Sequence, residues 1–282
     1  MKITKSSLLF APLLTISLNG MDFQATFGLH DFMVNNIKTD GYPAHIKDGT
    51  SHTFGVDAGI WIRHTTPSDI NFLAKAEVFL DRDKDELDED HIPVWFDFLV
   101  DVDGPMYKIN ERNRLLWYVL IDNKQNTVSC IEREIRQHIG VGWEFHTQKF
   151  KVALNTYLGF YYIEIDDDTP KQRGYTRMEL DDGEASNAFE LETSYSFTQD
   201  WSIYAKAKRY SANAGFEELE TNYELLLSYS GENFLVEHST LNLNIKNVQY
   251  NFDRFNVHSD LTALPWDNDT LIKVYLSMPI DF

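Results

Sequence analysis

The sequence predicts an all-β, up-and-down antiparallel transmembrane β-barrel of about twelve strands. Three observations support this fold class. Apolar and polar residues alternate with a period of two in about a dozen segments. The connections between these segments alternate between long and short, which is typical of membrane barrels with short periplasmic turns and longer extracellular loops. No apolar run reaches about 18 residues, which excludes a bundle of transmembrane helices.

Composition narrows the function classes. The chain has 282 residues with 44 acidic and 25 basic side chains, for a net charge of -19. This balance argues against a nucleic-acid partner, because phosphates require a basic surface. The single cysteine, Cys130, excludes a disulfide framework and cysteine-ligated metal clusters. An aromatic content of 14% indicates a folded chain rather than a disordered acidic one.

Residues 1–20 have the layout of a secretory signal peptide. Lys2 and Lys5 precede a mostly apolar stretch over residues 8–18, and small or polar residues follow. We expect cleavage after Gly20, so that residues 21–282 form the barrel. The alternative is a buried N-terminal helix.

The strands follow from the alternation, as in Phe54, Val56 and Ala58 against Gly55 and Asp57. The expected strands are 22–35, 52–63, 70–81, 93–102, 106–121, 129–146, 149–165, 187–197, 201–211, 221–230, 233–244 and 271–282. Short turns are expected at 65–69, 103–105, 147–148, 198–200 and 231–232. Longer connections are expected at 36–51, 82–92, 122–128, 166–186, 212–220 and 245–270. Both ends of the barrel chain then lie at the turn end.

Tight turns also predict which residues lie opposite each other on neighbouring strands. If Phe197 pairs with Trp201, Glu192 lies opposite Lys206 and Glu190 opposite Lys208. By the same arithmetic, pairing Phe145 with Phe150 places Glu144 opposite Lys151, and pairing Arg63 with Asp69 places Asp57 opposite Lys75.

The polar face of these strands carries matched charges and tyrosines, which suits the wall of a barrel lumen. The alternative is the solvated outer face of a soluble sandwich or a lipocalin-like barrel. The residues predicted to line the lumen are Asp57, Lys75, Glu77, Glu144, Lys151, Glu190, Glu192, Lys206, Lys208, Glu224 and Lys273.

The last strand resembles the C-terminal strand of Gram-negative outer-membrane β-barrel proteins, whose final residue is commonly Phe. Its apolar positions are Ile272, Val274, Leu276, Met278, Ile280 and Phe282. It departs from the pattern in lacking a glycine and in having Pro279 near its end. The resemblance implies export to the outer membrane of a Gram-negative bacterium. It also implies contact with outer-membrane lipid and lipopolysaccharide, and recognition of this strand by the barrel-assembly machinery.

Aromatic residues beside the short turns agree with a membrane barrel, because aromatic rings favour the membrane–water boundary. The expected girdle is Phe145, Phe150, Phe197, Trp201, Tyr229, Phe234 and Phe282.

Motifs for hydrolysis, nucleotide binding and zinc binding are absent from the sequence. Outer-membrane phospholipases and lipid A 3-O-deacylases carry His-x-Ser-Asn, and the nearest stretch here is Glu237-His238-Ser239-Thr240. On a strand, His238 and Ser239 would point to opposite faces, so they could not form a nucleophile–base pair.

Acidic clusters are expected in the longer connections. Carboxylates could hold a divalent cation there, could form a vestibule that concentrates cations, or could simply keep the loops hydrated. Besides the two clusters that hold the candidate cation ligands, acidic groups lie at 179–184 and at Glu217, Glu218 and Glu220. The candidate cation ligands are Asp85, Glu86, Asp88, Glu89, Asp90, Asp166, Asp167 and Asp168.

These features predict a passive channel for small hydrophilic solutes with a preference for cations. Facing lumen charges would create a transverse field that orients polar solutes. No cofactor is expected apart from a loop-bound divalent cation. Two alternatives stay open: a lipid-modifying hydrolase, and a closed structural or receptor barrel that binds through its acidic loops.

Overall fold

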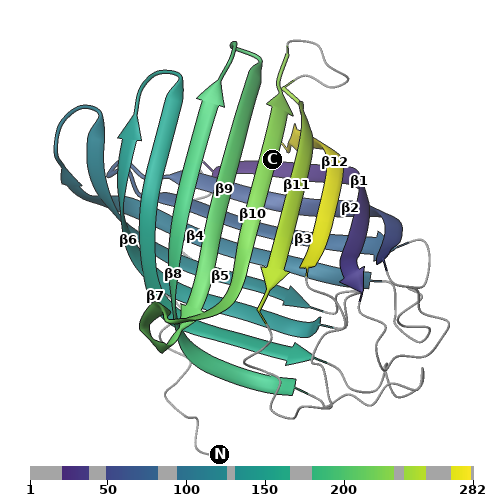
Figure 1. The fold of residues 1–282 in the computed structure, drawn as a ribbon. Helices are drawn as coiled ribbons and strands as arrows, with labels where there is room; N and C mark the ends of the chain where they lie inside the picture. The colour runs from purple at the N-terminus through teal and green to yellow at the C-terminus, as the bar shows by residue number, and fades with distance from the viewer. Residues whose placement is uncertain are drawn as a thin grey trace, which may run out of the picture.

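The computed structural model describes residues 21–37, 49–81, 94–125, 131–165, 180–231, 238–251 and 268–280. Within these ranges twelve antiparallel strands close into one barrel (Figure 1). The strands are β1 Met21–Ile37, β2 Gly49–Thr65, β3 Asn71–Asp81, β4 Val94–Lys108, β5 Asn113–Gln125, β6 Ile131–His146, β7 Phe150–Ile165, β8 Leu180–Ser196, β9 Trp201–Ala212, β10 Glu217–Tyr229, β11 Thr240–Tyr250 and β12 Asn268–Pro279.

Every strand pairs with its sequence neighbours, and β1 pairs with β12 to close the ring. The closing register runs from Gln24 opposite Pro279 to Asn35 opposite Asn268. Closure leaves no free sheet edge among these strands, which removes the unpaired backbone groups that an open sheet would expose. The predicted twelve-stranded up-and-down barrel is therefore confirmed.

The two faces of the barrel differ as the alternation predicts. Large apolar side chains point outward all the way around the ring, and the exposed fraction reaches 69% for Leu158, 66% for Ile139 and 65% for Leu29. Charged and polar side chains occupy the inner face, where Glu134 and Arg136 are fully buried. In an ordinary soluble protein the large apolar residues would instead be the buried ones.

Threonine side chains shape three of the tight turns. The Oγ1 atom of Thr66 accepts a hydrogen bond from the Ile70 amide at 3.1 Å. Thr147 accepts from the Phe150 amide at 3.0 Å and Thr198 from the Trp201 amide at 3.1 Å. A hydroxyl that bonds the backbone a few residues later stabilises a turn at that point. Turns occur near the predicted positions 65–69, 147–148 and 198–200, but the connections themselves are 66–70, 147–149 and 197–200.

The turn predicted at 103–105 is wrong. Strand β4 continues to Lys108, and the connection to β5 lies at 109–112. There the Asn110 side chain accepts hydrogen bonds from the backbone amides of Arg112 and Asn113 at 2.9 and 3.0 Å. The sequence Gly104-Pro105 reads as a turn, but the ladder absorbs it with an irregularity between Pro105 and Tyr107. The expected strands 93–102 and 106–121 shift accordingly.

Three further boundaries differ from the prediction. Strand β11 is Thr240–Tyr250 rather than 233–244. It therefore begins later than the predicted turn at 231–232 requires, and it includes the first part of the expected loop 245–270. Strand β8 begins at Leu180, within the expected loop 166–186. The expected long connection at 212–220 is shorter in the structure, because β9 ends at Ala212 and β10 begins at Glu217. A short 3-10 turn, Asn213–Gly215, lies between the two strands. Hydrogen bonds between neighbouring strands extend the ladder past the point where the apolar alternation fades.

One predicted register is confirmed and two are wrong. Glu190 lies opposite Lys208 and Glu192 opposite Lys206. By contrast, Glu144 lies opposite Ala153 and Asp57 opposite Phe79, because the turns before β7 and β3 begin and end at other residues than assumed. Both errors amount to an even number of residues, which leaves each side chain on its expected face.

Aromatic residues gather at the turn end of the outer face. The rings of Trp201 and Tyr229 lie 4.8 Å apart, and those of Tyr195 and Phe197 lie 5.1 Å apart. The expected girdle residues Phe234 and Phe282 lie outside the described residues. No helix among the described residues is both long enough and apolar enough to cross a bilayer.

Candidate functional site

The interior of the barrel is the candidate site. Six of the eleven residues predicted to line the lumen are buried on the inner face, with exposed fractions between 1% and 7%: Asp57, Glu77, Glu144, Glu190, Lys208 and Lys273. Lys75, Lys151, Glu192, Lys206 and Glu224 are partly accessible. The structure arranges ten of these residues in four separate groups rather than in one continuous ladder, whereas the Lys75 ammonium lies over the Trp61 ring.

The first group joins β12 to β2 and β3. The Lys273 ammonium lies 2.8 Å from Glu77 Oε1 and 3.0 Å from Asp57 Oδ1. His30 continues the chain of contacts, with Nδ1 at 3.6 Å from Asp57 Oδ2 and Nε2 at 2.7 Å from Asp81 Oδ1. When His30 is protonated, these side chains alternate in charge, so each buried ion has a compensating partner.

Gly55 makes room for this group. A Cβ atom at Gly55 would lie 2.6 Å from the His30 ring and 2.3 Å from the Leu80 carbonyl oxygen. Because the latter contact is with backbone, any larger residue would displace the strand. The glycine therefore lets the His30 imidazole approach the backbone of β2 closely.

The second group centres on Glu190. Its carboxylate lies 3.0 Å from Lys208 Nζ and accepts hydrogen bonds from Tyr157 at 2.6 Å and Asn155 at 2.9 Å. Lys208 also lies over the Tyr157 ring, with its Nζ 4.0 Å from the centroid. The cross-strand pair that the turn predicts is thus also held by Asn155 and Tyr157 of the single strand β7.

The third and fourth groups lie on either side of this pair. Lys206 Nζ is 3.1 Å from Glu224, which also accepts a hydrogen bond from Asn244 at 2.9 Å. Tyr204 donates to Glu192 at 2.8 Å. Toward the turn end, Glu144 contacts two cations, Arg114 at 2.7 Å and Lys151 at 2.9 Å, and the His146 ring lies 3.3 Å from the same carboxylate.

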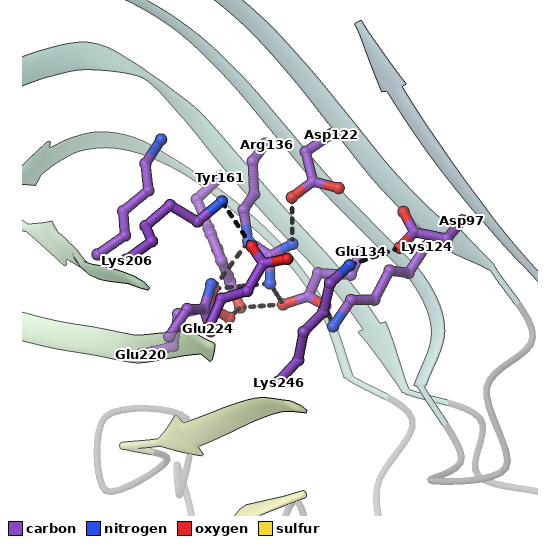
Figure 2. Close-up of polar contacts among 12 residues, drawn as sticks. Asp97, Asp122, Lys124, Glu134, Arg136, Tyr161, Lys206, Glu220, Glu224 and Lys246 are labelled. Carbon is purple, nitrogen blue, oxygen red and sulfur yellow. Dashed lines mark hydrogen bonds and ion pairs between the residues drawn. The ribbon is translucent and has the colours of Figure 1, made fainter. Parts of the chain in front are cut away.

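The most densely bonded interior group was missed by sequence reasoning. Arg136 on β6 contacts Glu134 on the same strand, Asp122 on β5 at 3.2 Å and Glu220 on β10, with Nε and Oε1 2.8 Å apart. Tyr161 donates to Glu134 at 3.0 Å and to Glu220 at 2.9 Å, as Figure 2 shows.

The prediction placed Glu220 in an acidic loop, whereas it is a fully buried residue of β10. Because Glu217 and Glu218 precede it closely, Glu220 was grouped with them as an acidic loop cluster and not assigned to a strand. The even-numbered positions Glu220, Asn222 and Glu224 share one face of the strand, and that pattern could have identified it.

Apolar and aromatic side chains fill the interior around these ions toward the loop end. The rings of Phe79 and Trp95 stack with centroids 3.6 Å apart, and Phe32 meets Trp95 edge-on at 5.8 Å. Ile163 and Leu219 are fully buried in the same cluster. The alternation of apolar and polar residues along the strands does not predict this apolar and aromatic cluster on the inner face.

A cavity of about 120 Å³ remains near the middle of the barrel, which is space for a few water molecules. Asp97 and Asp101 on β4 and Asp122 on β5 line one side. The other side is lined by Lys206 and Lys208 on β9 and by Lys246 on β11. These strands flank β10, which lies opposite β4, six places away in the ring of twelve. In Figure 1 strands β9 to β11 form the near wall, with β3 to β5 behind them. Lys75, Lys124 and Arg136 also lie on the first side and Glu190, Glu192 and Glu224 on the second, so acids and bases line both sides of the cavity.

A histidine–serine pair also lies inside. His138 Nε2 is 2.8 Å from Ser186 Oγ, and both residues are buried. The Nδ1 atom of His138 has no hydrogen-bond partner among the described residues. A hydrolytic triad needs an acid at that position to orient the base. The sequence candidate His238-Ser239 does not lie on a strand at all, since β11 begins at Thr240 and His238 adopts a positive φ of 61°.

The candidate cation ligands, Asp85 to Asp90 and Asp166 to Asp168, lie outside the described residues. Among the residues that are described, no group of three or more His, Cys, Asp or Glu side chains has an arrangement suited to a metal ion.

Comparison with known proteins finds similar structures but no similar sequences. No family model matches the chain, and no curated protein matches it. Among solved structures, an outer membrane channel from Pseudomonas putida F1 is similar with a TM-score of 0.51 and 9% identity, over 93% of this chain and 96% of that one. The NanC porin gives 0.48 and 8% over 90% and 100%, and the KdgM porin 0.45 and 12% over 91% and 99%. At these identities the likeness concerns the barrel fold.

Proposed function

We propose that this protein is an outer-membrane channel for small hydrophilic solutes. The observation that carries the proposal is the inversion of its two faces. Large apolar side chains are exposed around the whole outer surface, while charged side chains from opposite walls surround a cavity inside. A lipid environment outside and a hydrated path inside would satisfy both faces at once.

The outer face supports the membrane placement. Apolar side chains on strands all around the ring are between about a third and two thirds exposed, including Phe27, Ile60, Leu154, Phe189 and Val274. A continuous apolar surface of this kind would promote aggregation in water. Export through residues 1–20 and insertion of the barrel formed by residues 21–282 in the outer membrane are part of the proposal. Cell fractionation that found the protein among soluble periplasmic proteins would contradict it.

The inner face supports a channel that orients its solutes. Charged side chains of both signs surround the cavity and produce local fields, which would align a dipolar solute as it passes. The excess of acidic groups, with a net charge of -19 for the chain, favours cations over anions at the entrances. Lipid hydrolysis has no comparable support, since the His138–Ser186 pair is buried and lacks an orienting acid among the described residues.

Single-channel recording in planar bilayers tests the proposal. The purified full-length mature protein should give discrete conductance steps, and a salt gradient should give a reversal potential on the cation-selective side. A folded preparation, verified by a heat-modifiable shift on an unboiled gel, that gives no steps would overturn the channel.

A closed barrel is the second candidate. It is favoured by the contacts that cross the interior from β6 to β10 and by the aromatic cluster around Trp95. The same recordings distinguish the two, because a closed barrel would fold and insert without conducting.

A further inference from the structure

Most charges that line the central cavity already have a partner of opposite sign. Lys208 pairs with Glu190, Lys206 with Glu224 and Arg136 with Asp122, all within 3.2 Å. These ions neutralise one another and have little reason to bind a solute.

Two cavity-lining charges differ from the rest. The carboxylate of Asp101 has neither a hydrogen bond nor an ion pair with any described residue. The ammonium of Lys75 has no carboxylate within 4.0 Å in the described part of the chain. Instead, its Nζ lies 4.3 Å from the centroid of the Trp61 ring. Both charges line the same cavity.

The register places these two residues close together. Lys75 on β3 lies opposite Leu99 on β4, and Asp101 lies opposite Leu73, so the two charges are diagonal neighbours on the inner face. Diagonal neighbours on adjacent strands have Cα atoms about 7–8 Å apart. They nevertheless make no ion pair, because the Lys75 ammonium packs over Trp61, a buried residue. The cation–π contact holds the cation and leaves the carboxylate open.

We propose that Asp101 and Lys75 form a binding site for small zwitterionic solutes of amino-acid size. The solute's ammonium would donate hydrogen bonds to Asp101, and its carboxylate would accept them from Lys75. An ammonium and a carboxylate separated by a short carbon chain match this pair of opposite charges. A cation alone, or an anion alone, would leave one of the two protein charges uncompensated in the cavity. The role of this site in transport rests on the proposed function, but binding itself does not.

Direct binding to the purified full-length mature protein in detergent tests the site without requiring conductance. Radiolabelled γ-aminobutyrate should bind saturably, whereas butyrate, butylamine and butyramide should compete at least roughly tenfold more weakly, since each lacks one or both charge-assisted contacts. Asp101→Asn and Lys75→Gln should each weaken γ-aminobutyrate binding by roughly tenfold or more.

Matched controls lie on the same strands or the same inner face. Asp103→Asn changes a carboxylate two residues along β4 that accepts a hydrogen bond from Asn71 at 2.9 Å, and Lys151→Gln changes a lysine paired with Glu144. Neither residue lines the cavity, so both variants should bind as the parent does. Equal competition by butylamine, or full binding by either test variant, would overturn the site. If conductance is absent but saturable binding persists, the channel fails and the site stands; if conductance is present without binding, the reverse holds.

Discussion

Lys246 Nζ lies 3.5 Å from Asp97 Oδ2, although β11 and β4 are five places apart in the ring of strands. The pair therefore crosses the interior, and Figure 2 shows the two side chains reaching toward each other. Together with the contact between Arg136 and Glu220, it divides the cross-section at the level of the cavity.

Removing the Lys246 cation should therefore widen the path and leave an uncompensated acid in it. We expect Lys246→Ala to raise single-channel conductance and to shift the reversal potential toward cations. Lys149→Ala, in the turn between β6 and β7, is the control and should conduct as the parent does. A Lys246→Ala channel with unchanged conductance and selectivity would mean that ions do not pass this pair.

Two lysines of β9 that line the cavity provide a second test of the conduction path. Lys206→Ala with Lys208→Ala removes two of the cations that face Asp97 and Asp101, while the paired acids Glu224 and Glu190 remain. Cation selectivity should rise, because uncompensated carboxylates attract cations and repel anions. Reversal potentials in asymmetric potassium chloride measure the change, and an unaltered ratio would place these lysines away from the ion path.

Arg136 should matter most to stability. Arg136→Ala leaves Glu220 buried without its cation and Glu134 with only Lys124, at 3.7 Å, and breaking a buried ion pair in this way costs about 3–5 kcal/mol. The free energy of unfolding in urea, followed in lipid vesicles, measures the loss. Arg133→Ala is a matched control on the same strand. Its exposed pair with Glu164, at 3.5 Å, should contribute about 0–1 kcal/mol. Equal losses in the two variants would argue that the Arg136 network does not stabilise the fold.

The outer face can be tested at the middle of β7. Leu158 is 69% exposed, so Leu158→Arg would change stability little if water surrounded the barrel. In a bilayer, an arginine near the midplane should lower the free energy of unfolding by about 2–4 kcal/mol. Phe216→Arg, at an 89% exposed position in the β9–β10 connection, should have a much smaller effect. A neutral Leu158→Arg in vesicles would count against lipid contact at this position.

Local patterns in the sequence account for much of the fold. The alternation around Leu158 and Phe160 assigns side chains to the outer or inner face because successive residues of a strand point in opposite directions. The turn after Phe197 correctly predicts the pairing of Glu190 with Lys208, because this short connection ties the register to nearby residues. The prediction of a turn at Gly104-Pro105 was wrong, because strand pairing with β5 accommodates both residues in an irregular ladder.

The amino-acid sequence by itself determined the twelve-stranded barrel, the face on which the charges of the correctly predicted strand segments lie and the cross-strand pairs next to a correctly placed turn. Only the tertiary structure decided which charges meet across the interior. Arg136 and Glu220 are 84 residues apart, and Lys273 and Glu77 are 196 residues apart, on strands that are not neighbours. Strand alternation has a period of two and turn geometry acts over a few residues, so neither specifies contacts that exist only once the ring has closed.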